Sequence, residues 1–135
     1  MIMTALTEPY SELVRRYFAN PVHAGRLPDA YNDAFIGEAA ESEMGARVVL
    51  SAVVDGDTIR FLRSRVFGCP HLIAAVEFFC NEVEGQAIST LLGLNVPTLM
   101  EKLTIPVEKT GRLFILEDAV KLHHTALMEM THIEN

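Results

Sequence analysis

The order of the predicted elements indicates an α+β domain, because a short helix is followed by strands and the strands by helices. Two runs rich in Val, Ile and Leu, Arg47–Val54 and Thr58–Phe67, flank the dipeptide Asp55-Gly56. Those two residues suit the centre of a type I′ turn, so they are a strong hairpin signal. From residue 70 onward, apolar residues recur at helical spacing. We expect a small antiparallel sheet of about three strands, packed by an N-terminal helix and several C-terminal helices.

The N-terminal third predicts one helix and one weak strand. The helix is expected over Pro9–Phe18, with Thr7 as its N-cap and the proline in its first turn. Asn20-Pro21 should end it, because the residue before a proline disfavours helical dihedrals. Tyr31–Ile36 is a weak strand candidate. The residues between these two elements are expected to form a loop.

The C-terminal half predicts four helices of different lengths. The first spans Pro70–Glu84, with its proline at the first helical position and Gly85 at the C′ position. Two shorter helices are expected around Gln86–Leu92 and Val96–Lys102, and a long one from Leu113 to about residue 130. The residues that share the apolar face of the long helix are Leu113, Leu116, Val120, His123 and Leu127.

Length and composition favour one globular domain. The chain has 135 residues, of which 50% are apolar, enough to bury a core. We expect a single domain over residues 1–135, with residues 1–8 and 131–135 flexible. The net charge of −7 argues against nucleic acid as a partner. The start of the chain lacks the features of a secretory signal and no apolar run is long enough for a membrane span, so we expect a cytoplasmic protein without a membrane partner.

Cys69 lies at the corner between the predicted hairpin and the following helix. It follows Gly68 and precedes Pro70, which places it in the N-cap region. Free backbone N–H groups and the positive end of the helix dipole favour an anion there. Two interpretations stay open: a reactive or metal-binding thiol, or a small buried residue that closes the corner.

The second cysteine and the histidines give weaker signals. Cys80 lies among aromatic residues inside a predicted helix and is expected in the core. His71 could supply a ligand nitrogen, but taken alone it is expected at the surface of a helix N-terminus. His123 should lie in the core or an interface, and its neighbour His124 should point elsewhere, because residues one apart do not share a helix face. His23 lies in a predicted loop, and its role is open.

Three carboxylates precede the first strong strand. Glu38, Glu41 and Glu43 are expected to form a solvated acidic loop. The alternative is oxygen ligation of a metal beside Cys69, with zinc held by the cysteine together with Glu41, Glu43 or His71. An enzyme is not expected, because this histidine is the only nearby base in sequence for a cysteine nucleophile and no oxyanion donors can be identified.

Several segments resemble a known family. Tyr10–Val14, followed by Asn20-Pro21 and Gly25, is similar to the opening of IscU and of the N-terminal domain of NifU. Phe67-Gly68-Cys69 resembles their central cysteine loop, and Leu116–Val120 resembles the start of their last helix. The resemblance covers roughly residues 9 to 128. It implies an α+β fold of this type and a role in which sulfur from a cysteine desulfurase meets iron to build a cluster.

The chain departs from the family at the positions that bind the cluster. The resemblance implies three ligand cysteines, an aspartate and often a histidine, and of the cysteines only Cys69 matches. The first family cysteine falls at about Glu41 or Ser42, the third at Arg112, and the histidine before it at Gly111. A cluster iron prefers thiolates, and one thiolate cannot complete its ligand shell. The sequence therefore predicts degenerate ligand positions at Glu41, Gly111 and Arg112.

Two further positions complete the comparison with the family. Glu43 could stand where the family has its aspartate. The family's chaperone-recognition stretch, Leu-Pro-Pro-Val-Lys, is matched loosely by Ile105–Lys109. We also expect the fixed positive charge of Arg112 to form a salt bridge with Glu41 or Glu43, which would fill part of the former cluster space.

Together these observations predict an iron–sulfur assembly protein that resembles a scaffold but does not hold a three-cysteine cluster. It would bind partners or accept sulfur on Cys69. A cysteine desulfurase or another assembly protein is the partner that the resemblance implies, and iron or an iron–sulfur cluster is the group it would handle. Two alternatives stay open: a mononuclear zinc protein, and an interaction module without chemistry. A homodimer is a further open alternative, since a small apolar chain can leave exposed patches.

Overall fold

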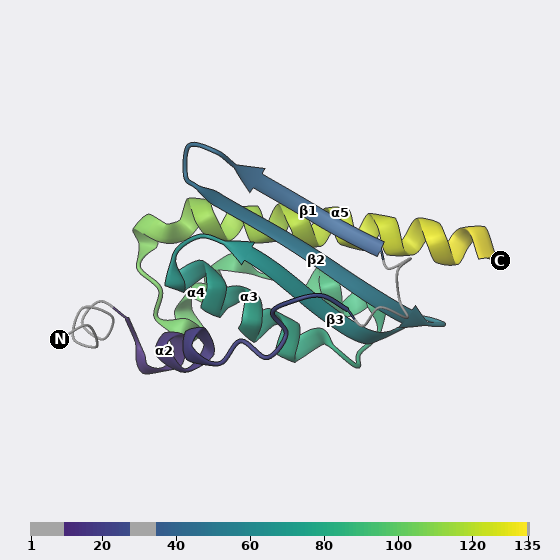
Figure 1. The fold of residues 1–135 in the computed structure, drawn as a ribbon, viewed down its shortest axis with the longest axis horizontal. Helices are drawn as coiled ribbons and strands as arrows, with labels where there is room; N and C mark the ends of the chain where they lie inside the picture. The colour runs from purple at the N-terminus through teal and green to yellow at the C-terminus, as the bar shows by residue number, and fades with distance from the viewer. Residues whose placement is uncertain (1–9, 28–34, 135) are drawn as a thin grey trace.

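The computed structural model describes residues 10–27 and 35–134 and confirms an α+β fold (Figure 1). A helix precedes three strands, and helices follow them, in the predicted order. The elements are α2 (Glu12–Ala19), β1 (Phe35–Glu41), β2 (Ala46–Asp55), β3 (Thr58–Phe67), α3 (Pro70–Val83), η2 (Ile88–Gly93), α4 (Val96–Leu103), η3 (Val107–Lys109) and α5 (Thr110–Glu134).

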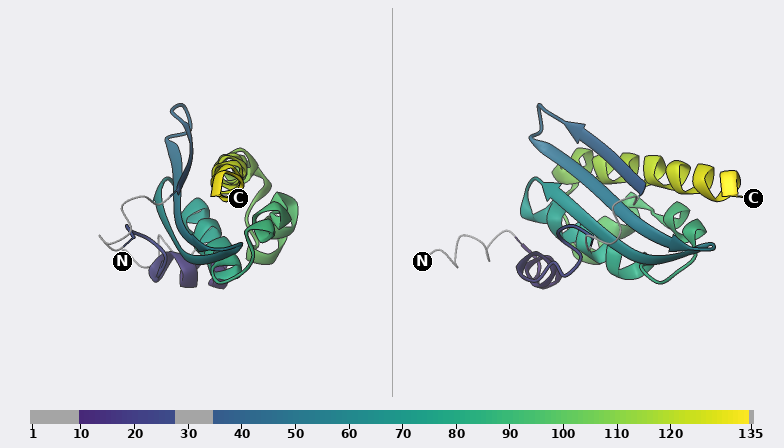
Figure 2. Two further views of the ribbon diagram at one scale, coloured as in Figure 1. Left: turned by 90° about the vertical axis from the view of Figure 1, so that its right-hand side faces the viewer. Right: turned by 45° about the vertical axis from the view of Figure 1, so that its right-hand side comes forward.

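The strands form one antiparallel sheet in the order β1-β2-β3. Helix α5 packs against β1 and β2, α3 packs against β3, and α2 packs on α3. Figure 2 shows the long helix on one side of the sheet, while the β1–β2 hairpin projects beyond it. The core lies between the sheet and these helices, and its fully buried side chains include Leu50, Leu62, Leu72, Leu113 and Leu116.

The hairpin turn is shifted by one residue from the prediction. Asp55 pairs with Thr58, so Gly56 and Asp57 form the two-residue loop. Gly56 has φ 64°, whereas Asp57 is not among the residues with positive φ. A positive φ at the first loop position alone is the type II′ pattern, so the expected type I′ turn is wrong. A register shift at Val53/Val54 interrupts the regular pairing of these two strands.

The first helix begins later than predicted. Ser11 is the N-cap of α2, and its hydroxyl accepts the N–H of Val14 at 3.2 Å. The same hydroxyl donates to the carbonyl of Leu103 at 2.6 Å, which ties the start of α2 to the end of α4. The predicted cap Thr7 and the expected flexible residues 1–8 lie outside the described residues.

The first strand lies downstream of its predicted position. Of the predicted strand 31–36, residues 31–34 lie outside the described part, and β1 runs from Phe35 to Glu41. The acidic stretch is therefore strand at Glu38 and Glu41 rather than loop. Gly37 allows α5 to approach, because a Cβ there would lie 2.3 Å from the His123 Cβ.

The C-terminal helices agree with the prediction in kind, with shifted ends. Gly85 follows α3 with φ 86°, as expected of a C′ glycine. The expected helix around 86–92 is a 3₁₀ helix, and α5 begins three residues early and continues through residue 134, so residues 131–134 are helical. The predicted apolar face of α5 is buried throughout, His123 included. In the part of the chain that is described, no helix combines the length and apolar character of a membrane span.

Candidate functional site

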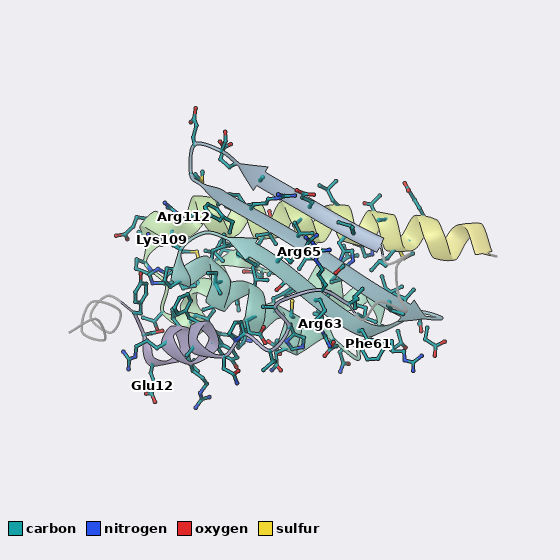
Figure 3. The ribbon with its side chains drawn as sticks, viewed as in Figure 1. Glu12, Phe61, Arg63, Arg65, Lys109 and Arg112 are labelled. Atoms are coloured by element: carbon teal, nitrogen blue, oxygen red, sulfur yellow. The ribbon has the colours of Figure 1, made fainter. Side chains whose placement is uncertain are left out.

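Three separate segments meet at one end of the molecule. The β1–β2 turn reaches the start of α5, because a Cβ built on Gly111 would lie 3.1 Å from the Met44 Cε. The corner before α3 lies near η3, because the charges of Glu108 and Lys109 act on His71. Figure 3 shows Lys109 and Arg112 at the same end of the molecule as the β1–β2 turn. The predicted degenerate positions thus belong to segments that the fold brings together.

Cys69 is the N-cap residue of α3, as predicted. It is half-buried and its thiol is free. Its carbonyl accepts the N–H of Ile73 at 3.1 Å, whereas its side chain makes no capping hydrogen bond. Gly68 allows the corner to pack closely, since a Cβ there would lie 2.9 Å from the Leu72 Cδ2. The thiol therefore lies at the positive end of a 14-residue helix and makes no capping hydrogen bond to the described residues.

His71 is buried, so the expected surface position is wrong. It is 2% exposed, and the ring of Tyr10 packs on it with a centroid separation of 4.6 Å. Neither ring nitrogen has a hydrogen-bond partner in the described part of the chain. Burial lowers the pKa of His71, and the charge of Lys109 lowers it further. The neutral imidazole is the favoured form.

Two of the three carboxylates, those of Glu38 and Glu41, make local contacts. Glu38 pairs with the guanidinium of Arg47 on the next strand. An oxygen of Glu41 accepts the N–H of Glu43 at 3.0 Å, which orders the turn. Within the described residues no group of three or more His, Cys, Asp or Glu side chains is placed to hold a metal ion. The structure therefore does not assemble Cys69 with these carboxylates or His71 into a ligand set.

Arg112 does not form the expected salt bridge. Its partly buried side chain lies in the first turn of α5. Among the described residues, no carboxylate lies within 4.0 Å of its guanidinium, so neither Glu41 nor Glu43 pairs with it. A guanidinium carries its charge at all physiological pH values. It therefore adds an unneutralised positive charge to this end of the molecule.

The donor set does not fit an iron–sulfur cluster as cargo on a single chain. Cluster irons are held mainly by thiolates. This end of the molecule offers one thiol, Cys69, and the second cysteine is fully buried inside α3. Gly111 has no side chain to donate, and Arg112 has no lone pair for iron. A complete ligand shell would need thiolates from another molecule.

A second cluster of polar side chains lies in the interior. His23 is 5% exposed and lies between the carboxylates of Glu77, in α3, and Glu84, the C-cap residue of α3. Its Nδ1 is 2.7 Å from Glu77 Oε2, and its Nε2 is 2.9 Å from Glu84 Oε1. Its backbone N–H also donates to Glu77 Oε1 at 2.9 Å. Only the imidazolium form can donate from both ring nitrogens at once.

Glu84 extends this cluster to β3. Its Oε2 accepts the backbone N–H of Leu62 at 2.8 Å and a guanidinium N–H of Arg63 at 2.9 Å. Burial alone would raise the pKa of this carboxyl, but the hydrogen bonds from Leu62, His23 and Arg63 outweigh it and hold the pKa below its usual value. The interior cluster thus joins the loop of His23, the edge of β3 and the end of α3.

Cys80 is a core residue, as predicted. It is fully buried, and burial raises the pKa of its thiol, with the negative charges of Glu77 and Glu84 adding to the effect. A thiol in this state is not a nucleophile. The sequence offered one signal for the interior cluster: the two glutamates are seven residues apart, which puts them on one face of α3. Nothing in the sequence linked them to His23.

The chain is similar to proteins of iron–sulfur cluster assembly. The model of the NifU-like N terminal domain matches residues 9–130. "Iron sulfur cluster assembly protein 1" of Trachipleistophora hominis is 29% identical over 112 residues, which cover 83% of this chain and 81% of that protein. "Iron sulfur cluster assembly protein 1, mitochondrial" of Debaryomyces hansenii is 26% identical over 114 residues, and the match spans 64% of its length, just under two thirds.

Solved structures share the fold at low sequence identity. A protein of Fervidobacterium islandicum AW-1, described as a candidate assembly scaffold for the SUF system, has a TM-score of 0.66 and 15% identity, over 85% of this chain and 96% of that one. The N-terminal part of a NifU-like protein from Brucella abortus has a TM-score of 0.56 and 12% identity, over 92% of both chains.

Proposed function

Since the chain belongs to the NifU-like N terminal domain family, we propose that it serves iron–sulfur cluster assembly as a sulfur acceptor, with Cys69 as the accepting group. One observation carries the proposal: where the family resemblance places several ligands, this chain keeps a single free thiol at a helix N-terminus. A lone thiol can carry sulfur, whereas it cannot complete a cluster's ligand shell. The protein would act stoichiometrically and not as an enzyme.

The transfer would proceed by thiol–persulfide exchange. The thiolate of Cys69 attacks the terminal sulfur of a persulfide on a cysteine desulfurase. A new S–S bond forms on Cys69, the S–S bond of the donor breaks, and the donor cysteine leaves as a thiolate. The proton of the Cys69 thiol passes to solvent before the attack. No external oxidant is needed, because the sulfane sulfur moves between two cysteines at the same oxidation level.

The surroundings of Cys69 suit an anionic sulfur species. The first backbone N–H groups of α3 point toward its N-terminus, where they favour negative charge. Lys109 and Arg112 add positive charge at the same end of the molecule, as Figure 3 shows. Arg112 has no carboxylate partner among the described residues to neutralise it. Glu108 and the turn residues Glu41 and Glu43 lie at the same end, so these two cations would favour an anionic sulfur species only where they are nearer to it than the carboxylates.

Mass spectrometry after incubation with a cysteine desulfurase and cysteine tests the proposal. We expect the intact protein and a Cys80→Ala variant to gain the mass of one sulfur atom, and a Cys69→Ser variant to gain none. Circular dichroism of both variants controls for folding. A gain of sulfur by Cys69→Ser, or no gain by the intact protein, would contradict the proposal.

An interaction module on the same fold is the second candidate, and one surface favours it. An apolar groove lies between α4 and η3, next to Val107, which is 82% exposed. Its lining includes Pro97, Met100, Ile105 and Pro106. This groove overlaps the stretch that resembles the family's chaperone-recognition segment. On this reading Cys69→Ser would leave growth of the host unchanged, whereas Val107→Asp would impair it.

A further inference from the structure

The two edges of the sheet differ in how many hydrogen bonds they receive from the rest of the described chain. The outer edge of β3 is closed by backbone and carboxylate hydrogen bonds. Ser64 donates to the His23 carbonyl and Leu62 to the Glu84 carboxylate, each at 2.8 Å. Further bonds close the same edge, from Gly25 to Ser64, Ile59 to Gln86 and Gly85 to Ile59. No strand of another molecule could pair here without displacing these contacts.

In the part of the chain that the structure describes, the outer edge of β1 has no such cover. Among the described residues, β1 pairs with β2 alone, and no further hydrogen bond involves its backbone. The pairing with β2 runs without interruption from Phe35 to Glu41, so no bulge twists the edge away. The strand Phe-Ile-Gly-Glu-Ala-Ala-Glu contains neither Pro nor Lys. Proteins commonly protect free edges with Pro, Lys or a bulge. Glu38 and Glu41 are the charges that β1 carries, and they disfavour a strand of like charge but not a basic one.

The charge around this edge selects the kind of strand that would pair. Three carboxylates, Glu38, Glu41 and Glu43, lie on β1 and its turn, against one guanidinium, Arg47, which pairs with Glu38. The balance is negative by two charges. Ile36 is 52% exposed on the same strand and offers an apolar contact. A second copy of the chain would bring the same carboxylates against themselves, which is unfavourable across paired strands.

We propose that β1 is a docking edge that takes an extended, basic segment of a partner protein as a fourth strand. Main-chain hydrogen bonds to the free edge would supply affinity, and Lys or Arg of the segment would lie near Glu38 on one face of the sheet and near Glu41 on the other. The proposal uses no property of Cys69 and stands apart from sulfur transfer. Since the hairpin end of β1 touches the start of α5 through Met44 and Gly111, the docked segment would have one end at the candidate site.

Hydrogen exchange with a synthetic peptide tests this edge. The probe is a capped peptide of alternating Lys and Val. We expect it to slow exchange of alternate β1 amides, those not bonded to β2, and to leave β3 amides unchanged. Two peptides serve as controls: one with Pro at every second Val, which removes donors, and one with Glu in place of Lys. Neither should protect β1.

A pair of protein variants separates edge docking from general attraction of a basic peptide. Ala40→Lys places a positive charge on the exposed face of β1, and Asn81→Lys makes the same charge change on exposed α3. We expect Ala40→Lys to weaken peptide binding about fivefold and Asn81→Lys to leave it within about twofold. Equal effects of both variants, or no β1 protection in the intact protein, would overturn the proposal. Protection of β1 without peptide, together with a dimer in sedimentation, would also overturn it in favour of a second copy.

Discussion

His23 and His71, both at most 5% exposed, lie in opposite surroundings. His23 has a carboxylate oxygen within 2.9 Å of each ring nitrogen. His71 has no hydrogen-bond partner for either nitrogen among the described residues and packs against the ring of Tyr10. Figure 3 shows the two regions apart, with Arg63 of the interior cluster well away from Lys109 and Arg112.

The difference shows which region the fold depends on. A buried charge is tolerated when hydrogen bonds and opposite charges satisfy it, and the interior cluster meets this condition. At the Cys69 end, the thiol has no capping bond and Arg112 has no described carboxylate partner. Polar groups left without partners add nothing to stability, so they are free to serve binding or chemistry. We therefore expect substitutions in the interior cluster to affect stability, and substitutions at the Cys69 end to affect reactivity.

The largest expected contrast is between the two thiols. Cys69 is half-buried, whereas Cys80 is fully buried and the pKa of its thiol is raised by burial. Iodoacetamide should modify Cys69 about a thousandfold faster than Cys80, because Cys80 reacts only after an opening that costs about 4 kcal/mol. Peptide mapping over a time course measures both rates. Equal rates in the native protein would break the contrast, while equal rates in denaturant serve as the control.

Removing His23 should cost more stability than any other single substitution at a histidine. His23→Ala removes the imidazole partner of the nearly buried Glu77 carboxylate and leaves it the backbone N–H of residue 23, and breaking a buried pair typically costs about 3 kcal/mol of unfolding free energy. Urea unfolding measures the loss. His124→Ala on α5 is the matched control and should change stability by less than about 1 kcal/mol. If His23→Ala lost no more unfolding free energy than His124→Ala, the interior cluster would not be a source of stability.

The interior cluster should also affect how the unfolding free energy changes as the pH falls below neutral. Because the folded-state pKa of Glu84 is lowered, its contribution is complete above its unfolded pKa of about 4.5 and is lost as the pH falls through the folded value. Glu84→Gln should therefore cost about 2 kcal/mol at pH 7, and the difference from the intact protein should shrink toward pH 3. Unfolding free energies at both pH values test the sign. A difference that grows in acid would contradict it.

His71 should give the smallest change. His71→Phe loses no hydrogen bond that the described residues make and keeps a ring against Tyr10. We expect the unfolding free energy to change by less than about 1 kcal/mol, and a gain is consistent with removing unpaired buried nitrogens. Urea unfolding of His71→Phe and His23→Ala under the same conditions compares the two histidines directly. A loss near 3 kcal/mol would show that His71 is a structural residue like His23.

Local signals predicted part of the fold. The bounds of β3 and α3 follow from the glycine turn before the strand and from Pro70 and Gly85 at the helix ends, and all of these act within a few residues. β1 was misplaced because Gly, Ala and Glu have poor strand propensity. It is a strand because β2 pairs with it and α5 packs closely at Gly37. Contacts of this kind join residues far apart in the sequence, so the residues of β1 alone do not predict them.

The candidate site shows the same limit. Cys69 at the helix N-terminus was predicted, because its neighbours in sequence determine that corner. The burial of His71 was not, because Tyr10 of the N-terminal segment covers it. The role of His23 could not be predicted because its partners, Glu77 in α3 and Glu84 at the end of α3, are 54 and 61 positions away in the sequence. The salt bridge expected for Arg112 was wrong, since proximity of segments does not fix where a long side chain points.

Native mass spectrometry after incubation with a cysteine desulfurase, cysteine and ferrous iron tests the central claim most directly, because one spectrum reports both sulfur and iron on each chain. The account predicts the mass of sulfur on Cys69 and no retained iron, with the signal lost in Cys69→Ser. A single chain that carries the mass of an intact iron–sulfur cluster would contradict it.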